Sequence, residues 1–201
     1  MSANKRLSRS FFEQPTLKVA RNLLGMRLVR IENGIRLAGV ITEAEAYRGE
    51  EDLACHAKAG RTPRTLVMYG QPGHAYVYFT YGMHWMLNFV TEAEGFPAAV
   101  LIRGIHAVEG LDIIAQRRKG RPPTQWTDGP AKLCQALNLD KIFNGSDICS
   151  SDAELFVEAG TPISDSTVTI GPRVGLNTVS EPWKSMPWRF RCKIEDEWPV
   201  E

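Results

Sequence analysis

The chain has 201 residues, of which 43% are hydrophobic and 23% are charged, and its formal net charge is +1. This length supplies one substantial core, so we expect a single domain over residues 1–201 with a flexible segment over residues 1–10. The near-neutral charge excludes a coat of positive charge over the whole surface but permits a local basic face.

The sequence contains no long apolar run and no clustered metal-binding residues. It lacks a run of 18 apolar residues and the apolar stretch of a signal peptide, so we expect no membrane partner and a cytoplasmic location. The cysteines lie far apart and form no CxxC pair, so we expect neither a disulfide framework nor a metal site. A phosphate loop and a dinucleotide motif are also missing, so we expect no cofactor.

The first half of the sequence predicts a helix, a hairpin and a long loop. Apolar residues share one face of residues 16–24, and Gly25 would end that helix. Residues 26–31 and 35–47 have the pattern of strands, and Asn33-Gly34 between them is a strong hairpin signal. Residues 48–72 are polar and hold several glycines and prolines. We expect a loop there, with one short helix over residues 52–56 that Asp52 caps.

The second half mixes strands and helices. Residues 75–81, 85–90, 98–105 and 189–193 are typical of strands, and residues 108–118 of a helix. A further helix opens at Asp128-Gly129-Pro130, with Asp128 as its cap. Strands in runs with helices between them, without a βαβ repeat, predict an α+β fold. We expect a curved, mainly antiparallel sheet flanked by helices.

The segment EAYRGEEDLACH, residues 45–56, holds the first candidates for chemistry. Glu45 and Tyr47 are two residues apart on a strand, so their side chains point to the same face. His56 follows after a short turn, which lets a carboxylate, a phenol and an imidazole converge at the end of this strand. A lone glutamate or histidine is usually an ordinary surface or structural residue, so the functional interpretation of this segment depends on the segments around it.

The segment YVYFTYGMHW, residues 76–85, is unusually aromatic. Alternation along a strand places Tyr76 and Tyr78 on one face and Phe79 and Tyr81 on the other. The structural interpretation is a half-buried aromatic strand. The functional interpretation is a surface for stacking bases, worth about 1–3 kcal/mol per base. The turn Tyr81-Gly82-Met83 suits insertion into a duplex.

Basic residues gather in three groups, which favours binding to phosphates when they lie beside an aromatic strand. The groups are Lys58, Arg61 and Arg64; Arg117, Arg118, Lys119 and Arg121; and Lys184, Arg189, Arg191 and Lys193.

Six segments in one order resemble the alkyladenine (3-methyladenine) DNA glycosylase family. They are EAYRGEEDLACH, YVYFTYGM, Asn88, LIRG around Arg103, DGPAKLCQAL and RVG over residues 173–175. The resemblance implies a DNA glycosylase of base excision repair, which flips damaged purines out of double-stranded DNA, hydrolyses their N-glycosidic bond and leaves an abasic site. Lys58 is the only lysine close to residues 45–56, and we interpret it as a phosphate contact or a solvated side chain, so we expect a monofunctional enzyme that does not cut the strand. Nothing in the sequence demands more than a monomer, and we expect the protein to associate with the nucleoid while it acts on DNA.

The resemblance also implies a role for individual residues. Glu45 would activate the water and Arg103 would orient it, with Val174 and Gly175 on the water and sugar side. The base pocket would be formed by Tyr47, His56, Tyr78 and Asn88, of which Asn88 disfavours the 2-amino group of guanine. Tyr81 would fill the gap in the duplex. The backbone would be gripped by Arg61, Thr62 and Met83.

The sequence departs from the family pattern at Ala44, where threonine is familiar, at His84, where tyrosine is familiar, and in a shorter loop after Gly60. These departures concern substrate preference and backbone contacts, and the sequence does not rank the lesions. Two alternative hypotheses stay open. One is a non-catalytic nucleic-acid binder, like the accessory RNA-binding domain of a formyltransferase, and the other is a hydrolase of free nucleosides.

Overall fold

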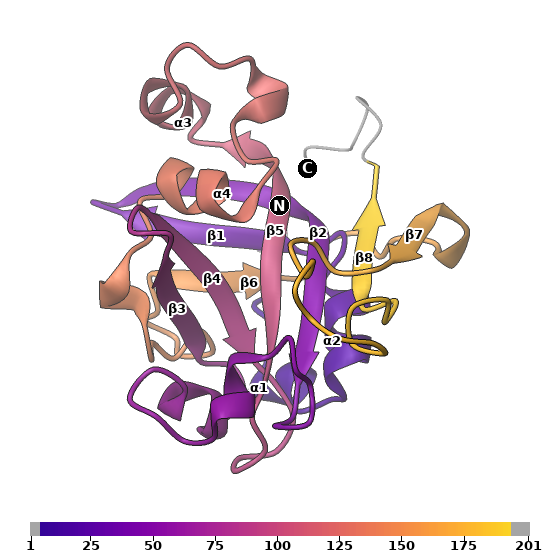
Figure 1. Cartoon of the computed structure of the whole chain (residues 1–201). Coiled ribbons are helices and arrows are strands. Elements are labelled where there is room, and N and C mark those ends of the chain that lie inside the picture. The colour runs from indigo at the N-terminus through magenta and orange to yellow at the C-terminus, as the bar shows by residue number, and fades with distance from the viewer. Residues whose placement is uncertain (1–4, 194–201) are drawn as a thin grey trace.

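An antiparallel sheet of eight strands forms the centre of the molecule (Figure 1). The computed structural model describes residues 5–193. Strands follow the order β3-β4-β5-β2-β1-β6, and β8 pairs with both β2 and β7. The strands are β1 (Arg27–Glu32), β2 (Ile35–Arg48), β3 (Ala75–Thr80), β4 (His84–Val90), β5 (Ala98–Glu109), β6 (Leu155–Glu158), β7 (Val168–Gly171) and β8 (Arg189–Cys192). The helices are α1 (Arg9–Phe12), α2 (Thr16–Asn22), α3 (Leu111–Arg117) and α4 (Pro130–Ala136). The predicted α+β class is confirmed.

The hairpin of β1 and β2 forms where the sequence predicts it. Asn33 and Gly34 both have positive φ, at 51° and 77°, which a tight two-residue hairpin turn requires. The long strand β2 then pairs with β1 through its first half and with β5 along most of its length. Its second half also pairs with β8, so several strands meet around β2.

An irregularity in β2 decides which side chains face the core. The register with β5 shifts between residues 41 and 44, where extra residues interrupt the pairing. Before the shift Leu37 and Ile41 lie in the main core, and after it Ala44 and Ala46 do. Strand alternation after the shift therefore turns Glu45 to the opposite face of the sheet.

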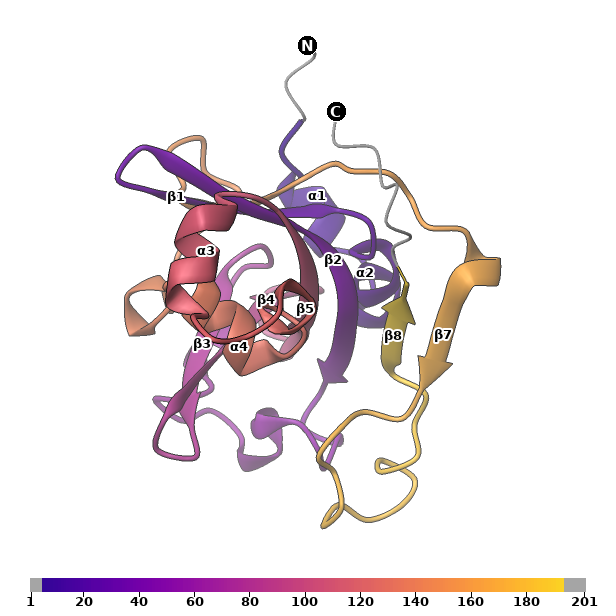
Figure 2. The ribbon, with the colours of Figure 1, turned by 90° about the horizontal axis from the view of Figure 1, so that it is seen from above.

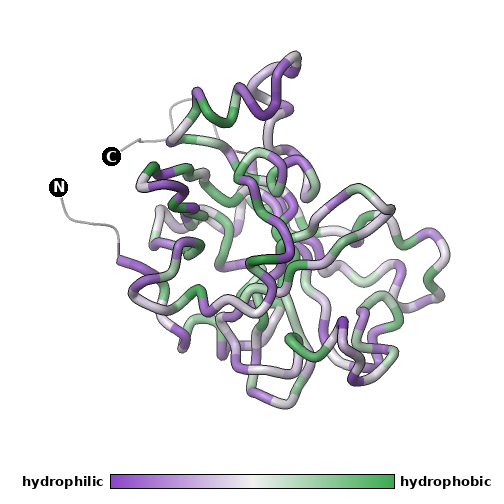
Figure 3. The backbone as a smooth tube through the Cα atoms, turned by 90° about the vertical axis from the view of Figure 1, so that its left-hand side faces the viewer, coloured by the Kyte–Doolittle hydropathy of each residue, from purple (hydrophilic) through white to green (hydrophobic). Residues whose placement is uncertain are grey.

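The two faces of the sheet are covered by different kinds of structure. Helix α2 packs against β2 and β5, and helix α4 against β4 and β5, and both contribute buried residues to the main core. The opposite face is covered by two irregular segments, residues 49–74 and 172–188, which both lie along the lower edge of Figure 2. Figure 3 shows hydrophobic and hydrophilic stretches interspersed along the whole described backbone.

Several predicted boundaries are corrected. Helix α2 ends at Asn22, and α1 before it was not expected. Residues 108 and 109 continue β5, so α3 begins later than expected, at Leu111. Gly129 is the N-cap of α4, and the predicted cap Asp128 instead forms an ion pair with Lys132.

The predicted short helix after β2 is also corrected. Residues 52–55 are not helical, and single 3-10 turns occur at His56–Ala59 and Leu66–Tyr69. Asp52 is completely buried and bound to Arg173, so its carboxylate has a partner other than a helix start. This contact spans 121 residues of sequence, which is why local patterns could not predict it.

The flexible segment expected over residues 1–10 falls partly on residues 1–4, which lie outside the described residues. From residue 6 onward the chain contacts the sheet. Arg6 forms a β-bridge with Glu158 and donates to the carbonyl of Ser150, and α1 begins at Arg9. No helix within residues 5–193 is long and apolar enough to cross a membrane.

Candidate active site

A pocket of about 330 Å³ opens on the sheet face opposite the helices. Its walls come from β2–β5, the segment after β2, the β7–β8 loop and the start of α4. The lining residues are Tyr47, Ala54, Cys55, His56, Met68, Tyr76, Tyr78, Thr80, Tyr81, Met86, Asn88, Ala99, Leu101, Arg103, Pro130, Val174, Gly175 and Leu176. Eight residues for which the sequence predicted a role are among them: Tyr47, His56, Tyr78, Tyr81, Asn88, Arg103, Val174 and Gly175.

The strand register brings distant residues into one row. Tyr76 pairs with Asn88, Asn88 with Leu101, and Leu101 with Glu45, across β3, β4, β5 and β2. Directly paired residues of adjacent strands have Cβ atoms about 4.5–5.5 Å apart and share a face. The backbone alone therefore places Glu45 at one end of a row whose other members line the pocket.

Glu45 is completely buried and is not itself a lining residue, but it lies directly behind the pocket wall, in contact with the lining residues Tyr47, Arg103 and Val174. Its Oε2 atom accepts hydrogen bonds from the Tyr47 hydroxyl at 2.8 Å and from Arg103 Nη1 at 3.3 Å. Its Oε1 atom accepts one from the backbone N–H of Val174 at 2.7 Å. A carboxylate oxygen can accept two hydrogen bonds, so within residues 5–193 the unused acceptor position belongs to Oε1.

The environment of Glu45 acts on its pKa in two directions. Burial raises the pKa above its usual value because it disfavours the charged carboxylate. The Arg103 charge and the hydrogen bonds from Val174 and Tyr47 oppose this shift, because each stabilises the carboxylate. A buried carboxylate with a raised pKa and a spare acceptor position is suited to remove a proton.

Aromatic rings surround the cavity beside Glu45. The imidazole of His56 lies edge-on to Tyr78, with ring centres 4.6 Å apart, and Tyr76 packs behind them. Asn88 is almost fully buried and donates from Nδ2 to the carbonyl of Tyr76 at 3.0 Å. The hydrogen bond to Glu45 fixes the hydroxyl end of Tyr47. The pocket wall therefore combines aromatic rings with polar groups from Asn88, Arg103 and the tyrosine hydroxyls.

His56 is held in one neutral form. Arg64 Nη2 lies 3.4 Å from His56 Nε2, and a guanidinium can only donate, so Nε2 is the acceptor. The proton then lies on Nδ1, which is 3.0 Å from the Tyr76 hydroxyl. Burial, together with the charges of Arg64 and Lys58, lowers the pKa of His56 to about 4. The imidazole is therefore uncharged at neutral pH.

The tip of the β3–β4 hairpin projects from the protein. Tyr81 is 81% exposed and has a φ of 52°, and Gly82 after it has a φ of 66°. The predicted alternation is wrong at this point, because the turn begins at Tyr81 and brings this residue to the rim of the pocket. Phe79 stays on the other face, where it packs against Trp85.

Three predicted contact residues lie outside the pocket. Met83 is 68% exposed and borders a separate groove between the hairpin tip and α4. Arg61 lies over the ring of Tyr69, and Thr62 bonds to Thr65, both within the segment after β2. None of the three residues lines the pocket.

The three basic groups differ in how they are paired. In the first group, Arg64 lies over the ring of Tyr78, so this basic residue is beside the aromatic strand as expected. In the second group Arg117 is neutralised by Glu32, and in the third Arg189 is bound to Glu43. The other two groups keep exposed members outside these ion pairs, which are Lys119, Arg121, Lys184, Arg191 and Lys193. Of the three groups, the first is the one with an arginine packed on a pocket-lining ring.

The sequence missed residues that support the site. Glu43 accepts hydrogen bonds from both Arg103 and Arg189, at 2.8 and 2.7 Å, and so fixes the arginine beside Glu45. Asp52 and Arg173 form a fully buried ion pair behind Tyr47. The one available signal was the strand alternation that places Glu43 on the face of Glu45.

The site offers a cavity lined by aromatic side chains, with the buried carboxylate of Glu45 directly behind its lining. Such a cavity can hold a planar ring, and the carboxylate can act on a water beside it. No group of three or more His, Cys, Asp or Glu side chains suited to a metal ion is found within residues 5–193.

Comparison with known proteins gives a consistent result. The family described as methylpurine-DNA glycosylase (MPG) matches residues 10–196. A protein of Methanocella arvoryzae is 48% identical over 188 residues, which cover 93% of this chain and 92% of that protein. A protein of Myxococcus xanthus is 48% identical over 184 residues, covering 92% and 88%. Both carry the name "Putative 3-methyladenine DNA glycosylase".

Proposed function

Because the chain belongs to the methylpurine-DNA glycosylase family, we propose that it excises damaged purines from double-stranded DNA with Glu45 as the base that activates water. Membership in this family makes the chain a DNA glycosylase of DNA repair. The finer proposal is hydrolysis of the N-glycosidic bond, which leaves an abasic site. The observation that carries it is the buried Glu45 carboxylate with its spare acceptor position at the wall of an aromatic pocket.

Base flipping follows from the position of the pocket. A purine stacked in a duplex cannot reach a carboxylate buried in a protein, so the nucleotide must leave the stack at a cost of a few kcal/mol. Tyr81 stands at the pocket rim on an exposed turn, and it would fill the space that the base leaves. Met83 beside it, with Arg61 and Thr62, would contact the sugar–phosphate backbone.

The side chains of Tyr47, His56 and Tyr78, which form an aromatic cage in the pocket, suit an alkylated purine. Purines alkylated at N3 or N7 carry a positive charge, and a cation over an aromatic face gains about 0.5–2 kcal/mol. Tyr47, Tyr78 and the neutral His56 supply such faces without an opposing charge of their own. Asn88 in the wall would disfavour the 2-amino group of guanine. This gain is modest, so the weak glycosidic bond of a cationic base would supply much of the discrimination.

The attacking water would bind at Glu45 Oε1. Oε2 already accepts from Tyr47 and Arg103, whereas Oε1 accepts from Val174 alone among the described residues. Val174 and Gly175 line the pocket at this side, where the sugar of a flipped nucleotide would lie. The carboxylate there can take the proton of the water and stabilise the positive charge that develops on the sugar. General-base catalysis contributes about 10²–10⁴-fold.

Strand cutting is not part of the proposal. A lyase needs an amine that attacks the sugar, and none of the described pocket-lining residues is a lysine. Lys58, two residues after His56, donates a hydrogen bond to the carbonyl of Leu53. We therefore expect an abasic product with an intact strand.

The test is base release from duplexes that carry one 3-methyladenine, 7-methylguanine, ethenoadenine or hypoxanthine, followed by a check for nicks. We expect release without nicking from at least one lesion. Replacement of Glu45 by Gln should reduce the single-turnover rate by about 10²-fold or more while lesion-DNA binding persists. Binding without release by the wild type would support the non-catalytic binder, and release from free nucleosides at the duplex rate would support the nucleoside hydrolase.

A further inference from the structure

The loop between β7 and β8 is anchored at one buried residue. Arg173 is 4% exposed, whereas the other residues of the loop, 172–188, are exposed or half-buried and form neither helix nor strand. Its guanidinium bonds to both oxygens of Asp52, at 2.6 and 2.9 Å. It also donates to the carbonyls of Ala46 and Trp183, at 3.0 and 3.2 Å. Arg173 thus ties the start of the loop to β2, to the segment after β2 and to the far part of the same loop.

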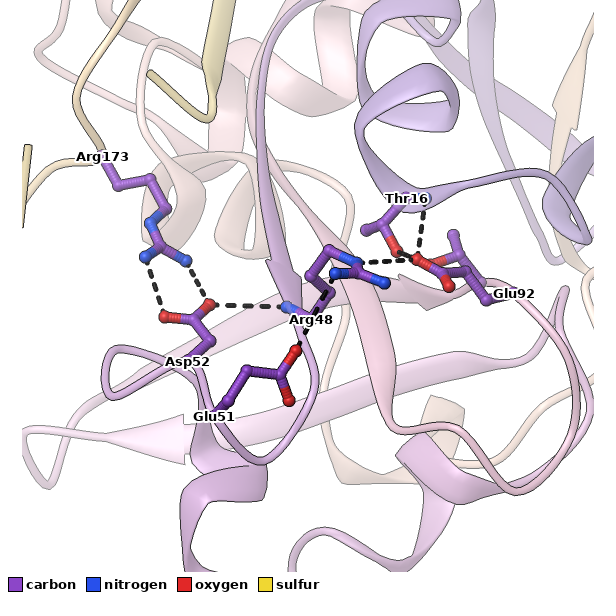
Figure 4. A network of polar contacts seen from close by, with 7 residues as sticks. Thr16, Arg48, Glu51, Asp52, Glu92 and Arg173 are labelled. Carbon is purple, nitrogen blue, oxygen red and sulfur yellow. Dashed lines mark hydrogen bonds and ion pairs between the residues drawn. The ribbon is translucent and has the colours of Figure 1, made fainter. Parts of the chain in front are cut away.

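The ion pair reaches the site at two points. Residue Val174, next in the chain, donates its N–H to Glu45 Oε1. The Arg173 guanidinium lies 4.6 Å from the centre of the Tyr47 ring, behind the pocket. Figure 4 shows Arg173 and Asp52 facing one another in a two-pronged contact, with the backbone N–H of Arg48 on the same carboxylate.

We propose that Asp52 and Arg173 are positioning residues, which hold the Val174 N–H on Glu45 Oε1 and support the Tyr47 ring without touching the substrate. The proposal rests on the function proposed for Glu45. It adds that the Asp52–Arg173 ion pair determines how the acceptor positions of the Glu45 carboxylate are occupied.

The energetics of the pair explain why it can do this. An irregular exposed loop has many conformations, and ordering each of its residues costs backbone entropy, so a hydrogen bond from such a loop needs a fixed anchor. A two-pronged arginine–carboxylate contact has one favourable geometry, and a buried charge tolerates no arrangement that leaves it unpaired. The pair therefore gives the loop one position at residue 174.

The pair also has a predictable effect on the titration of Glu45. The N–H of Val174 stabilises the charged carboxylate, so its loss raises the pKa of Glu45. The groups that face Glu45 from the packed elements are Tyr47 and Glu43 on β2, Arg103 on β5, Tyr78 on β3, Arg189 on β8 and the Val174 N–H of the loop. Neither Asp52 nor Arg173 bonds to Glu45, so both act on it through position.

The substitution Asp52→Asn separates position from charge. It leaves the Arg173 charge unpaired near the site, and an added positive charge would by itself lower the pKa of Glu45. Displacement of the Val174 N–H would raise it. The direction in which the acid limb of the pH–rate profile moves therefore tells the two effects apart.

The experiment measures single-turnover release of 7-methylguanine from a duplex between pH 5 and 9, with lesion-duplex affinity measured in parallel. For Asp52→Asn we expect a rate about tenfold lower near neutral pH, an acid limb about one pH unit higher, and a Kd within about threefold of wild type. If Asp52→Asn does not fold, the double variant Asp52→Asn/Arg173→Gln, which leaves no unpaired charge, is expected to show the same shift.

The control is Glu158→Gln on β6. It removes the charge of Glu158 from a partly buried ion pair with Arg36 at the far edge of the sheet, so it should leave the acid limb in place. The positioning role would be overturned if the acid limb of the Asp52 variant stayed in place or moved to lower pH, or if the rate fell equally at every pH. Either result would leave the function proposed for Glu45 standing. Absence of Glu45-dependent release by the wild type would overturn the proposed function instead.

Discussion

The two faces of strands β2–β5 are built from alternate residues of the same strands, yet they differ in polarity and in the kind of structure that covers them. On the core face, Ala44, Leu87, Phe89, Val100 and Ile102 are buried under helices. On the pocket face, Glu45, Asn88 and Arg103 are polar, and irregular segments cover them. The contrast suggests that one face holds the strands in place while the other carries chemistry whose groups would be unfavourable in a core.

Substitutions on the core face should lower the stability of the protein but leave base release nearly unchanged. Phe89 is completely buried, and its truncation in Phe89→Ala should lower the free energy of unfolding by about 3–5 kcal/mol, because it removes apolar contacts and leaves a cavity. Urea unfolding checks this. Under conditions where the variant is folded, base release should stay within about threefold of wild type. A large loss of release by the folded variant would contradict the separation of the two faces.

The hairpin tip should behave in the opposite way. Tyr81 is 81% exposed, so Tyr81→Ala should change the free energy of unfolding by no more than about 0.5 kcal/mol. Release from a duplex should fall about tenfold, since the flipped state loses a stacking contact of about 1–3 kcal/mol. Release from a single-stranded lesion should change less. Equal effects on both substrates would mean that Tyr81 does not fill a gap in the duplex.

A residue of the pocket face should also change how the stability of the protein depends on pH, although we expect this effect to be smaller. His56 has a pKa of about 4 in the folded protein, below its usual 6.5, so the unfolded chain binds more protons between these values. Stability from neutral His56 is present above about pH 6.5 and is lost as the pH falls towards 4. The raised pKa of Glu45 acts in the opposite direction in the same range.

The substitution His56→Gln isolates the histidine contribution. Without His56, stability should fall less between pH 6.5 and 4.5 than in the wild type, as unfolding at a series of pH values can measure. An unchanged slope would mean that His56 is protonated in the folded state or that its pKa is not lowered.

The fold follows from the sequence where the signal is local. Alternation marked the strands, and Asn33-Gly34 marked the hairpin, because both depend on adjacent residues. The cage residues were found through motifs that resemble a known family. The register shift between residues 41 and 44 has no clear signal in the sequence, although it decides the face of Glu45.

Long-range contacts were the part that the sequence could not supply. Asp52 has the pattern of a helix cap, yet its partner Arg173 lies 121 positions away. The hydrogen bond from Val174 to Glu45 spans 129 positions. Such pairs depend on how the loops fold over the sheet, which neither periodicity nor local propensity records.

The most direct test of the central claim is the pH dependence of single-turnover release of 7-methylguanine by the wild type and by Glu45→Gln. This lesion is already cationic, so the acid limb reports the enzyme rather than protonation of the base. The general base must be ionised, and the pKa of Glu45 is raised above 4.5. We expect the wild-type rate to rise through a limb above pH 4.5 to a plateau. For Glu45→Gln we expect a rate at least about 10²-fold lower and without this limb. A Glu45→Gln variant that keeps both the rate and the limb would contradict the role of Glu45 as the general base.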